Sequence, residues 1–520
     1  MRKSLYALGL ATVTSFAAAA QHDHDHGAGG RPPEQLGKVS FPTSCSAAVQ
    51  PQFERGVALL HSFWFGEGLK AFRAVAAQDP ACAMAYWGVA INRLLNPFGG
   101  EPGSAFLEEG AAAIEQARAI GAKTPRERDY IEAAAILYTD VSAKRWHERA
   151  VAYERAMARV VERYPDDVEA KIFYALALNF AADLSDQTYA KQLEAAALLE
   201  PLLVTHPDHP GVAHFLIHSY DYPPLADKGL AAARRYASIA PSAAHALHMP
   251  SHIFTRVGAW EDSAATNRRS EDNARANSSG DEILHAIDYQ VYAYLQLARD
   301  AEAKQALERA TEATSKYKLI RAAGPYGAAA APARYALERG DWKAAAALPV
   351  NPGKVLYANA VTHFARAVGA ARAGDAAAAK ADVAKLAELR DGLAKDKYWT
   401  EQVEIQRLAA EAWIALADQR RDEALALMRT AADRESASEK SPISPGPILP
   451  ARELLGDLLM ELGQPAAALK EYEASQQREP NRFRGWYGAA TAAAKAGDTA
   501  KARLYQAKLA ALAKNGGTRP

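Results

Sequence analysis

The chain has few of the residues that would mark a redox protein or one driven by charge. Its 520 residues include only two cysteines, Cys45 and Cys82, with no CxxC pair, and 61 basic side chains balance 61 acidic ones. The zero net charge predicts no binding to nucleic acid or to an anionic membrane. In an oxidising compartment, two cysteines favour one structural disulfide, Cys45–Cys82, over a redox role.

Long apolar runs and common catalytic motifs are also missing. No segment has eighteen consecutive apolar residues, so no membrane-spanning helix is predicted. HExxH, the P-loop, GxGxxG and GxSxG are absent, which argues against the usual zinc-protease helix and against a nucleotide cofactor. Low Gly and Pro contents, with abundant Ala, Leu, Glu, Lys and Arg, favour a helical protein.

Residues 1–20 are typical of an export signal. Arg2 and Lys3 precede a short apolar stretch, and the alanines before residue 21 are suitable for cleavage after Ala19 or Ala20. We therefore expect the protein to be exported to the periplasm or secreted; a buried N-terminal helix is the alternative. Residues 21–44 begin with a polar, Gly-rich run and are predicted to be flexible. The histidines of HDHDH (His22, His24 and His26) could hold Cu(II) or Ni(II) loosely or form a solvated tail.

A pattern with a period of about 34 residues runs through the rest of the chain. In residues 449–480, Gly456, Ala468, Tyr472 and Pro480 occupy positions 8, 20, 24 and 32 of a repeat that starts at Leu449. Residues 53–80 match the same pattern, and AMAYWGVA opens the next unit. The chain resembles the tetratricopeptide repeat over most of residues 49–514.

The resemblance implies an all-α solenoid of helical hairpins, a right-handed superhelix with a concave groove and roughly twelve helix pairs. We expect residues 45–437 to form the solenoid, 438–450 a Pro-rich hinge, 451–514 a C-terminal pair of repeats and 515–520 a tail. The segments HPGVAHFLIHSYD and SAAHALHMPSHIFTRVGAW also resemble a group of exported bacterial tetratricopeptide-repeat proteins. No activity follows from that second resemblance.

The strongest chemical feature is a histidine cluster. Eight of the 14 histidines fall within 80 residues, several of them three or four apart, which places imidazoles on one face of a helix. Repeat frames set from Pro241, Gly258 and Ala303 put six histidines on the groove-lining face of three neighbouring first helices. These predicted metal ligands are His214, His218, His245, His248, His252 and His285, with Asp288 as a seventh.

Other histidines fit this pattern less well. His206 and His209 lie in a turn and are expected to be structural, His363 falls at a packing position, and His61 is far from the cluster along the chain. Pro250 lies between His248 and His252. It predicts either a kink that re-aims His252 or a helix that begins at Pro250.

Nitrogen ligands without sulfur suit zinc, copper or nickel. One hypothesis is a binding protein whose groove holds a metal and a peptide or partner protein. The alternative is a metal-dependent enzyme, a hydrolase or an oxidoreductase, acting on a small-molecule substrate. In the enzyme, Asp288 or Asp221 would be the base or would orient a ligand, and Arg256 would bind an anionic substrate group. A plain interaction scaffold without metal is the third reading.

Overall fold

The computed structural model describes residues 33–517, and those residues form helices joined by loops. The chain divides into two units, Met1–Glu34 and Gln35–Pro520, and everything below concerns the second. The predicted signal peptide and the HDHDH histidines lie outside the described residues. Within the described part, no helix combines the length and the apolar character needed to cross a bilayer.

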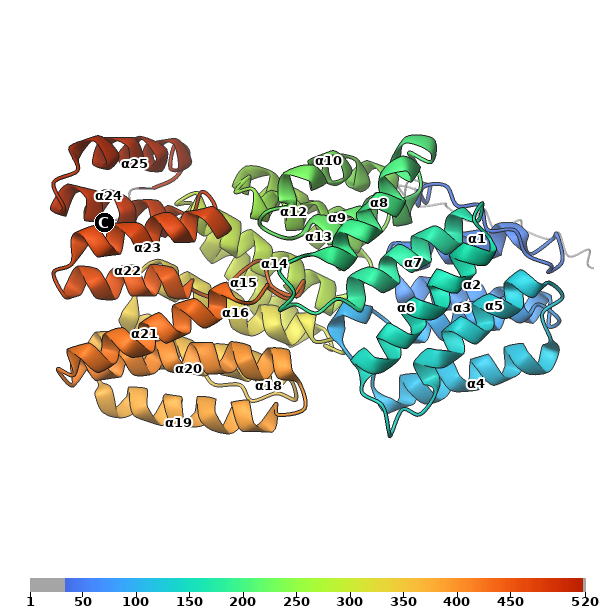
Figure 1. The fold of residues 1–520 in the computed structure, drawn as a ribbon, viewed down its shortest axis with the longest axis horizontal. Helices are drawn as coiled ribbons and strands as arrows, with labels where there is room; N and C mark the ends of the chain where they lie inside the picture. Colours follow the sequence, from blue (N-terminus) through green and yellow to red (C-terminus); the bar gives the residue numbers. More distant parts are fainter. Residues whose placement is uncertain (1–32, 518–520) are drawn as a thin grey trace, which may run out of the picture. The chain divides into compact units, whose positions relative to one another are not determined.

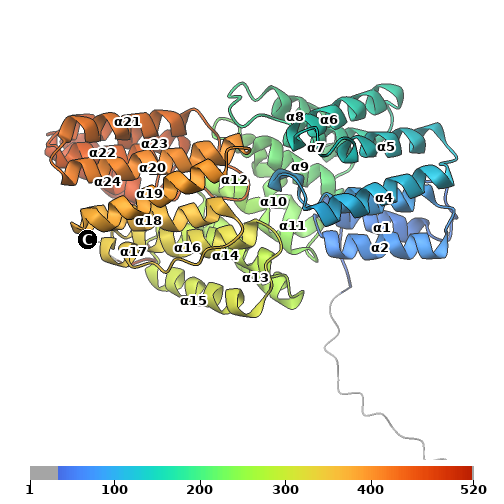
Figure 2. The ribbon, with the colours of Figure 1, turned by 90° about the horizontal axis from the view of Figure 1, so that it is seen from below.

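The helices follow one another in twelve pairs, as the repeat pattern predicts (Figures 1 and 2). The first six pairs are α1 (Gln50–His61) with α2 (Phe65–Gln78), α3 (Ala83–Arg93) with α4 (Ser104–Ile120), α5 (Pro125–Ala135) with α6 (Trp146–Arg163), α7 (Val168–Phe180) with α8 (Ala190–Thr205), α9 (Pro210–Tyr220) with α10 (Leu230–Ile239), and α11 (Ala244–His248) plus α12 (Pro250–Arg256) with α13 (Trp260–Ala276). The other six are α14 (Gly280–Gln296) with α15 (Asp300–Lys316), α16 (Ala323–Glu338) with α17 (Trp342–Ala346), α18 (Leu356–Ala373) with α19 (Ala376–Gly392), α20 (Lys397–Ala417) with α21 (Arg421–Ser436), α22 (Ala451–Glu461) with α23 (Pro465–Arg478), and α24 (Phe483–Lys495) with α25 (Thr499–Leu512).

Short turns between paired helices carry the residues that such turns require. At the end of α18, Gly374 has a φ of 89°, a left-handed conformation that glycine adopts without strain. Asp375 then caps α19, because its side chain accepts a hydrogen bond from the Ala378 amide. The sequence AGDA therefore ends one helix and starts its partner within two residues.

Close contact between paired helices depends on glycine opposite an aromatic ring. Gly56 and Gly88 both pack against the ring of Phe72, and a Cβ atom at either position would overlap it. Gly456 and Gly488 have the same relation to Tyr472 near the other end of the chain. These contacts join positions 8 and 24 within a repeat and position 8 of the next repeat. The tetratricopeptide-type hairpin packing is thus present at both ends.

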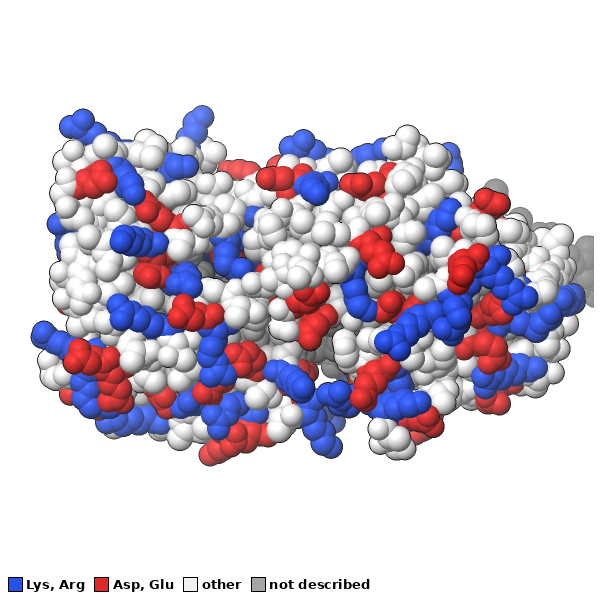
Figure 3. Space-filling model, viewed as in Figure 1, with Lys and Arg blue, Asp and Glu red and all other residues white. Residues whose placement is uncertain are grey.

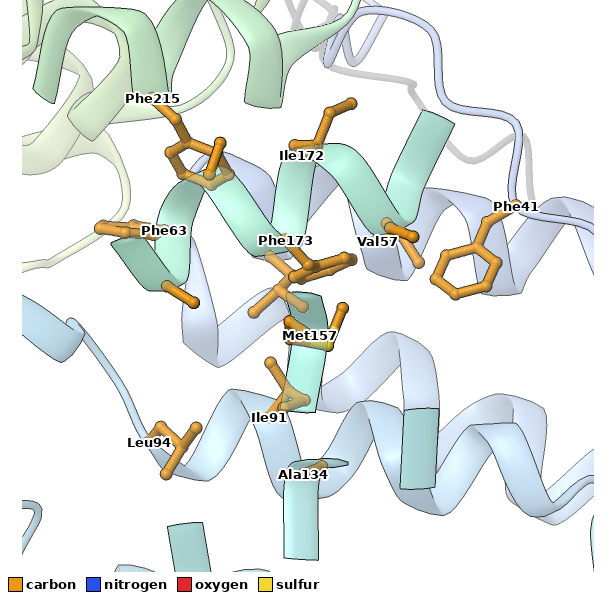
Figure 4. Packing of buried hydrophobic residues seen from close by; sticks show 14 of the residues in the cluster. Phe41, Val57, Phe63, Ile91, Leu94, Ala134, Met157, Ile172, Phe173 and Phe215 are labelled. Atoms are coloured by element: carbon orange, nitrogen blue, oxygen red, sulfur yellow. The ribbon is translucent and has the colours of Figure 1, made fainter. Parts of the chain in front are cut away.

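The core of the first half is rich in aromatic side chains. Phe41, Phe173 and Phe215 belong to one buried cluster that extends from the N-terminal segment to α12 (Figure 4). Phe41 is fully buried against Trp87, and Leu36 is also buried, so two side chains anchor the segment 35–44, which was predicted to be flexible, to the core. Cys45 and Cys82 form a disulfide that joins this segment to the start of α3.

Residues 438–450, predicted as a hinge, pack against the central helices. Lys440 binds Asp221, and Ser444 receives a hydrogen bond from Arg334 of α16. Ile443 and Ile448 are buried. The two following helix pairs also contact the middle of the chain, where Arg482 donates to Tyr292 of α14. We name residues 438–450 the crossing segment, because it runs from the C-terminal repeats onto the central helices.

The surface carries both charges in mixture. Lys and Arg side chains alternate with Asp and Glu over the face shown in Figure 3. This agrees with the equal numbers of basic and acidic residues in the sequence.

Candidate metal centre

Four central helices, α9, α11, α12 and α14, bring the six predicted histidines together. Their exposed fractions run from 0% to 7%, so they are buried instead of lining an open groove. Aromatic rings from elsewhere in the chain cover them: Phe63 stacks on His245, and Phe98 stacks on His218 with ring centroids 4.1 Å apart. The expected groove face is therefore closed by residues that the repeat frame does not include.

The first trio consists of His214 and His218 from α9 and His245 from α11. The Nε2 atom of His214 lies 3.2 Å from the Nε2 of His218 and 3.2 Å from the Nε2 of His245. One nitrogen from each ring lies within 4.8 Å of the others.

The second trio consists of His248 from α11, His252 from α12 and His285 from α14. The Nε2 atoms of His248 and His252 are 3.0 Å apart, and the His285 ring lies 4.3 Å from the His248 ring between centroids. The buried Nδ1 of His285 makes no hydrogen bond with any described residue. The trios adjoin, because the rings of His218 and His252 are 6.0 Å apart.

Pro250 lies between His248 and His252 of the second trio and is the first residue of a helix. Of the two readings of the sequence, the structure has α11 ending at His248 and α12 beginning at Pro250. Met249 between them keeps right-handed helical angles. His248 and His252 consequently still project to the same side.

Oxygen acceptors fix the orientation of three of these rings. The Nδ1 atom of His214 lies 2.6 Å from the His61 carbonyl, and that of His248 lies 2.6 Å from the Asn267 side-chain oxygen. The Nδ1 of His252 lies 2.8 Å from the Asp221 carboxylate. Because these oxygens only accept, we assign the ring proton to Nδ1 in all three. The Nε2 atoms then carry lone pairs when the rings are neutral.

Burial keeps the rings neutral. Desolvation lowers the pKa of His214, His218 and His248 well below the usual histidine value, and neighbouring histidines add to the effect. Burial also lowers the pKa of His252 to about 4 and that of His285 to about 3. At neutral pH these side chains have the protonation state in which imidazole binds metal.

The facing nitrogens of His248 and His252 are the most informative geometry of the site. With both protons on Nδ1, two lone pairs meet at 3.0 Å without a hydrogen between them. Two nitrogens bound to one tetrahedral zinc ion at about 2.05 Å lie roughly 3.3 Å apart. The 3.0 and 3.2 Å separations are therefore close to those of ligands that share an ion.

The predicted acidic residues have different places. Asp221 contacts His252 and also pairs with Arg256, with 3.0 Å from Nε to Oδ1, and with Lys440 at 2.7 Å. It has the position of a residue that orients a ligand. Asp288 is instead paired with Arg334 at 3.0 Å and belongs to neither trio. The structure therefore does not group Asp288 with the histidines, because α16 supplies a cation that the helical spacing could not show.

Arg256 also differs from its expected role. It is 3% exposed and held by Asp221, with Glu439 and Glu479 nearby at 3.5 and 3.8 Å. Its guanidinium is thus engaged by carboxylates inside the protein, and it is not among the residues that line the cavity beside the histidines.

Several residues of the centre were not predicted. Asn267 had no signal in the sequence, and Lys440 lies 219 residues from its partner Asp221. Glu282, one turn before His285, lies 3.8 Å from the Nδ1 of His245. Its spacing to His285 on α14 was the one signal available for any of the three.

A second buried group lies beside the first trio. His61 and His209 each contact one oxygen of Glu169, at 2.8 and 2.9 Å. Burial opposes ionisation of this carboxyl, but the two histidines lower the pKa of Glu169 to about 2. His209 belongs to this group and to neither trio, whereas His61 is close to the cluster in space and supplies the carbonyl that holds His214.

A cavity of about 250 Å³ reaches the centre. Four of the six histidines line it: His218 and His245 from the first trio, His252 and His285 from the second. Its remaining wall is largely apolar and includes Phe98, Phe106, Met249, Ile320 and Ile443, with Asp281, Glu282 and Arg321 at one side. Ile320 is 64% exposed, which places it at the solvent side of the cavity.

Comparisons with known proteins add similar folds only. No protein-family model and no curated protein sequence matches the chain. Among solved structures, the human IFIT1 dimer with m7Gppp-AAAA is 13% identical, covers 83% of this chain and 90% of its own, and has a TM-score of 0.40. The APC/C hetero-tetramer Cut9–Hcn1 is 10% identical over 90% of this chain and 81% of its own, with a TM-score of 0.34. At these scores neither likeness carries an argument about this chain.

Proposed function

We propose that the six-histidine centre binds a transition-metal ion and that the protein uses it on a small molecule that enters the cavity. The observation that carries this proposal is the pair of facing lone pairs on His248 and His252. Without a cation, that arrangement is electrostatically unfavourable in a buried site. A bound ion converts it into coordination.

The ligand set favours a catalytic metal site over a structural one, in which every coordination position is filled by the protein. Three histidines per ion leave at least one coordination position open, as in catalytic zinc sites. All-nitrogen ligation suits zinc, copper or nickel. The cavity beside four of the ligands gives a small molecule access to such a position. This supports the metal-dependent enzyme more than the peptide-binding groove, because the histidines are buried.

Metal analysis with matched histidine variants tests the proposal. The protein is purified without a histidine tag, with the HDHDH histidines replaced by alanine, and is titrated with Zn(II) and Cu(II) against a chromophoric chelator. We expect binding at micromolar concentration or tighter, which His248→Ala weakens strongly. His363→Ala is the control, because His363 is buried against Asp382 outside the centre. Equal affinity in both variants, or no binding by the parent protein, would reject the proposal.

Export is proposed as part of this function. The Cys45–Cys82 disulfide supports an oxidising compartment, and residues 1–20 have the composition of a cleaved signal. N-terminal sequencing of the protein recovered from a periplasmic fraction tests it, and an intact Met1 would contradict it.

A further inference from the structure

The two trios open into one cavity instead of two separate ones. His218 and His245 belong to the first trio, His252 and His285 to the second, and all four line the same 250 Å³ space. A molecule in that space is therefore within reach of both trios. Two ions in such an arrangement would act on one ligand.

The charges around the centre compensate bound ions only in part. All six ligands are imidazoles, which bind as neutral groups. Asp221 is already paired with Arg256 and Lys440, and Glu282 with Arg321 at 2.7 Å. Asp281 and Glu101 also line the cavity, and Glu101 pairs with Arg149. Two divalent cations would consequently place excess positive charge in a buried site, where an isolated charge is costly. An anion from solution would supply part of the balance.

The size and walls of the cavity limit which anion fits. A cavity of about 150 Å³ lined by apolar side chains holds benzene, so about 250 Å³ accommodates one substituted ring. Phe98, Phe106, Met249 and Ile443 provide apolar contacts for such a body. The polar end of the ligand would lie against the histidines.

We propose that each trio holds one ion and that the cavity binds a small organic anion, a carboxylate attached to an apolar body of one ring, with its oxygens at the two ions. This inference rests on the proposed metal binding. It adds the number of ions and the chemical class of the ligand. Experiments can reject either addition and still show that the protein binds metal.

Metal stoichiometry tests the first half. We expect two Co(II) or Cu(II) ions per chain, with one ion left in His218→Ala and one left in His285→Ala, because each substitution removes a ligand from one trio only. Circular dichroism checks that both variants are folded. One ion per chain in the parent protein, or the loss of both ions in each folded variant, would overturn the two-ion assignment.

Anion binding tests the second half. The Cu(II)-loaded protein is titrated with azide, whose charge-transfer absorption reports an open position, and then with acetate, benzoate and benzylamine as competitors. We expect benzoate to displace azide at lower concentration than acetate does, because it also fills the apolar cavity. Benzylamine, which has the same ring but a positive charge, should not compete.

A substitution at the cavity wall distinguishes binding of the ligand's ring from binding of an anion to the metal. Ile320→Trp adds bulk at the exposed side of the cavity and touches no histidine ligand, so it should weaken benzoate binding by about tenfold or more and leave azide binding unchanged. Val350→Trp, at another exposed position that does not line the cavity, is the control. No azide signal in metal-loaded protein, or equal benzoate affinity in the two tryptophan variants, would overturn the proposed ligand class.

Discussion

Removing the Asn267 side chain should weaken metal binding more than it changes the stability of the metal-free protein. In the parent protein, Asn267 accepts the Nδ1 proton of His248, so the Nε2 lone pair points at His252. The Asn267 amide nitrogen donates to the Ser263 carbonyl, which confirms that the oxygen faces the ring. In Asn267→Ala, His248 is free to carry its proton on Nε2 and to donate it across 3.0 Å to His252. The metal-free protein then gains a hydrogen bond that metal must break.

The size of the effect follows from that exchange of partners. The new hydrogen bond contributes about 0.5–1.5 kcal/mol to the metal-free state, and the loss of orientation adds to it. Loss of such an outer partner typically weakens metal binding by about 10–100-fold, which corresponds to about 1.4–2.7 kcal/mol. The free energy of unfolding of the metal-free protein should change less than metal affinity does, because one hydrogen bond replaces another.

Two measurements on the same variants check this reasoning. Chelator competition gives the metal dissociation constant, and urea denaturation of metal-free protein gives the stability. Ser270→Ala is the control, since Ser270 is also buried on α13 and donates to the Ala244 carbonyl without touching a histidine. If Asn267→Ala binds metal as tightly as Ser270→Ala does, the assigned protonation of His248 is wrong.

Two further outcomes can be measured without metal. Burial lowers the pKa of His252 to about 4 in the folded protein, below the usual value of about 6.5 in the unfolded chain. As the pH falls from 6.5 to 4, His252 is therefore protonated in the unfolded chain before it is protonated in the folded one. This residue alone should lower the free energy of unfolding by roughly 3 kcal/mol at pH 4. Urea denaturation between pH 7.5 and 4 should show that loss, and a loss equally large in His252→Gln would contradict it. Separately, Gly88→Ala forces a methyl group into the Phe72 ring and should destabilise by about 1–3 kcal/mol, whereas Gly99→Ala, with open space around it, should be neutral by thermal denaturation.

The repeat pattern was sufficient to predict the helices and the grouping of the six histidines on neighbouring helices. Gly56, Gly456 and the aromatic positions opposite them set the pairing, because only a residue without a side chain permits that approach. Frames taken from Pro241 and Gly258 then put His214 and His248 on adjacent first helices. Helical periodicity and the repeat length are local properties, so they can be read from the sequence.

Burial and pairing could not be predicted in the same way. Phe63 and Phe98 cover the histidines from loops that the repeat pattern does not describe. Asp288 had the right spacing to His285 but is neutralised by Arg334, on the first helix of the next pair. The Pro-rich composition of residues 438–450 indicated a hinge, yet a proline-rich segment can also pack when its partners are supplied by distant helices. These features depend on contacts between residues far apart in the sequence.

The crossing segment also sets the order in which the centre can be assembled. The six ligands lie between residues 214 and 285, but Lys440 reaches Asp221 from 219 positions further along the chain. A growing or translocating chain therefore exposes all six imidazoles well before the segment that pairs with Asp221 has emerged. Contacts of such long sequence separation form late in folding. An ion that enters early would meet an unfinished site, so metal selection by the completed geometry requires that loading follow the arrival of the C-terminal repeats.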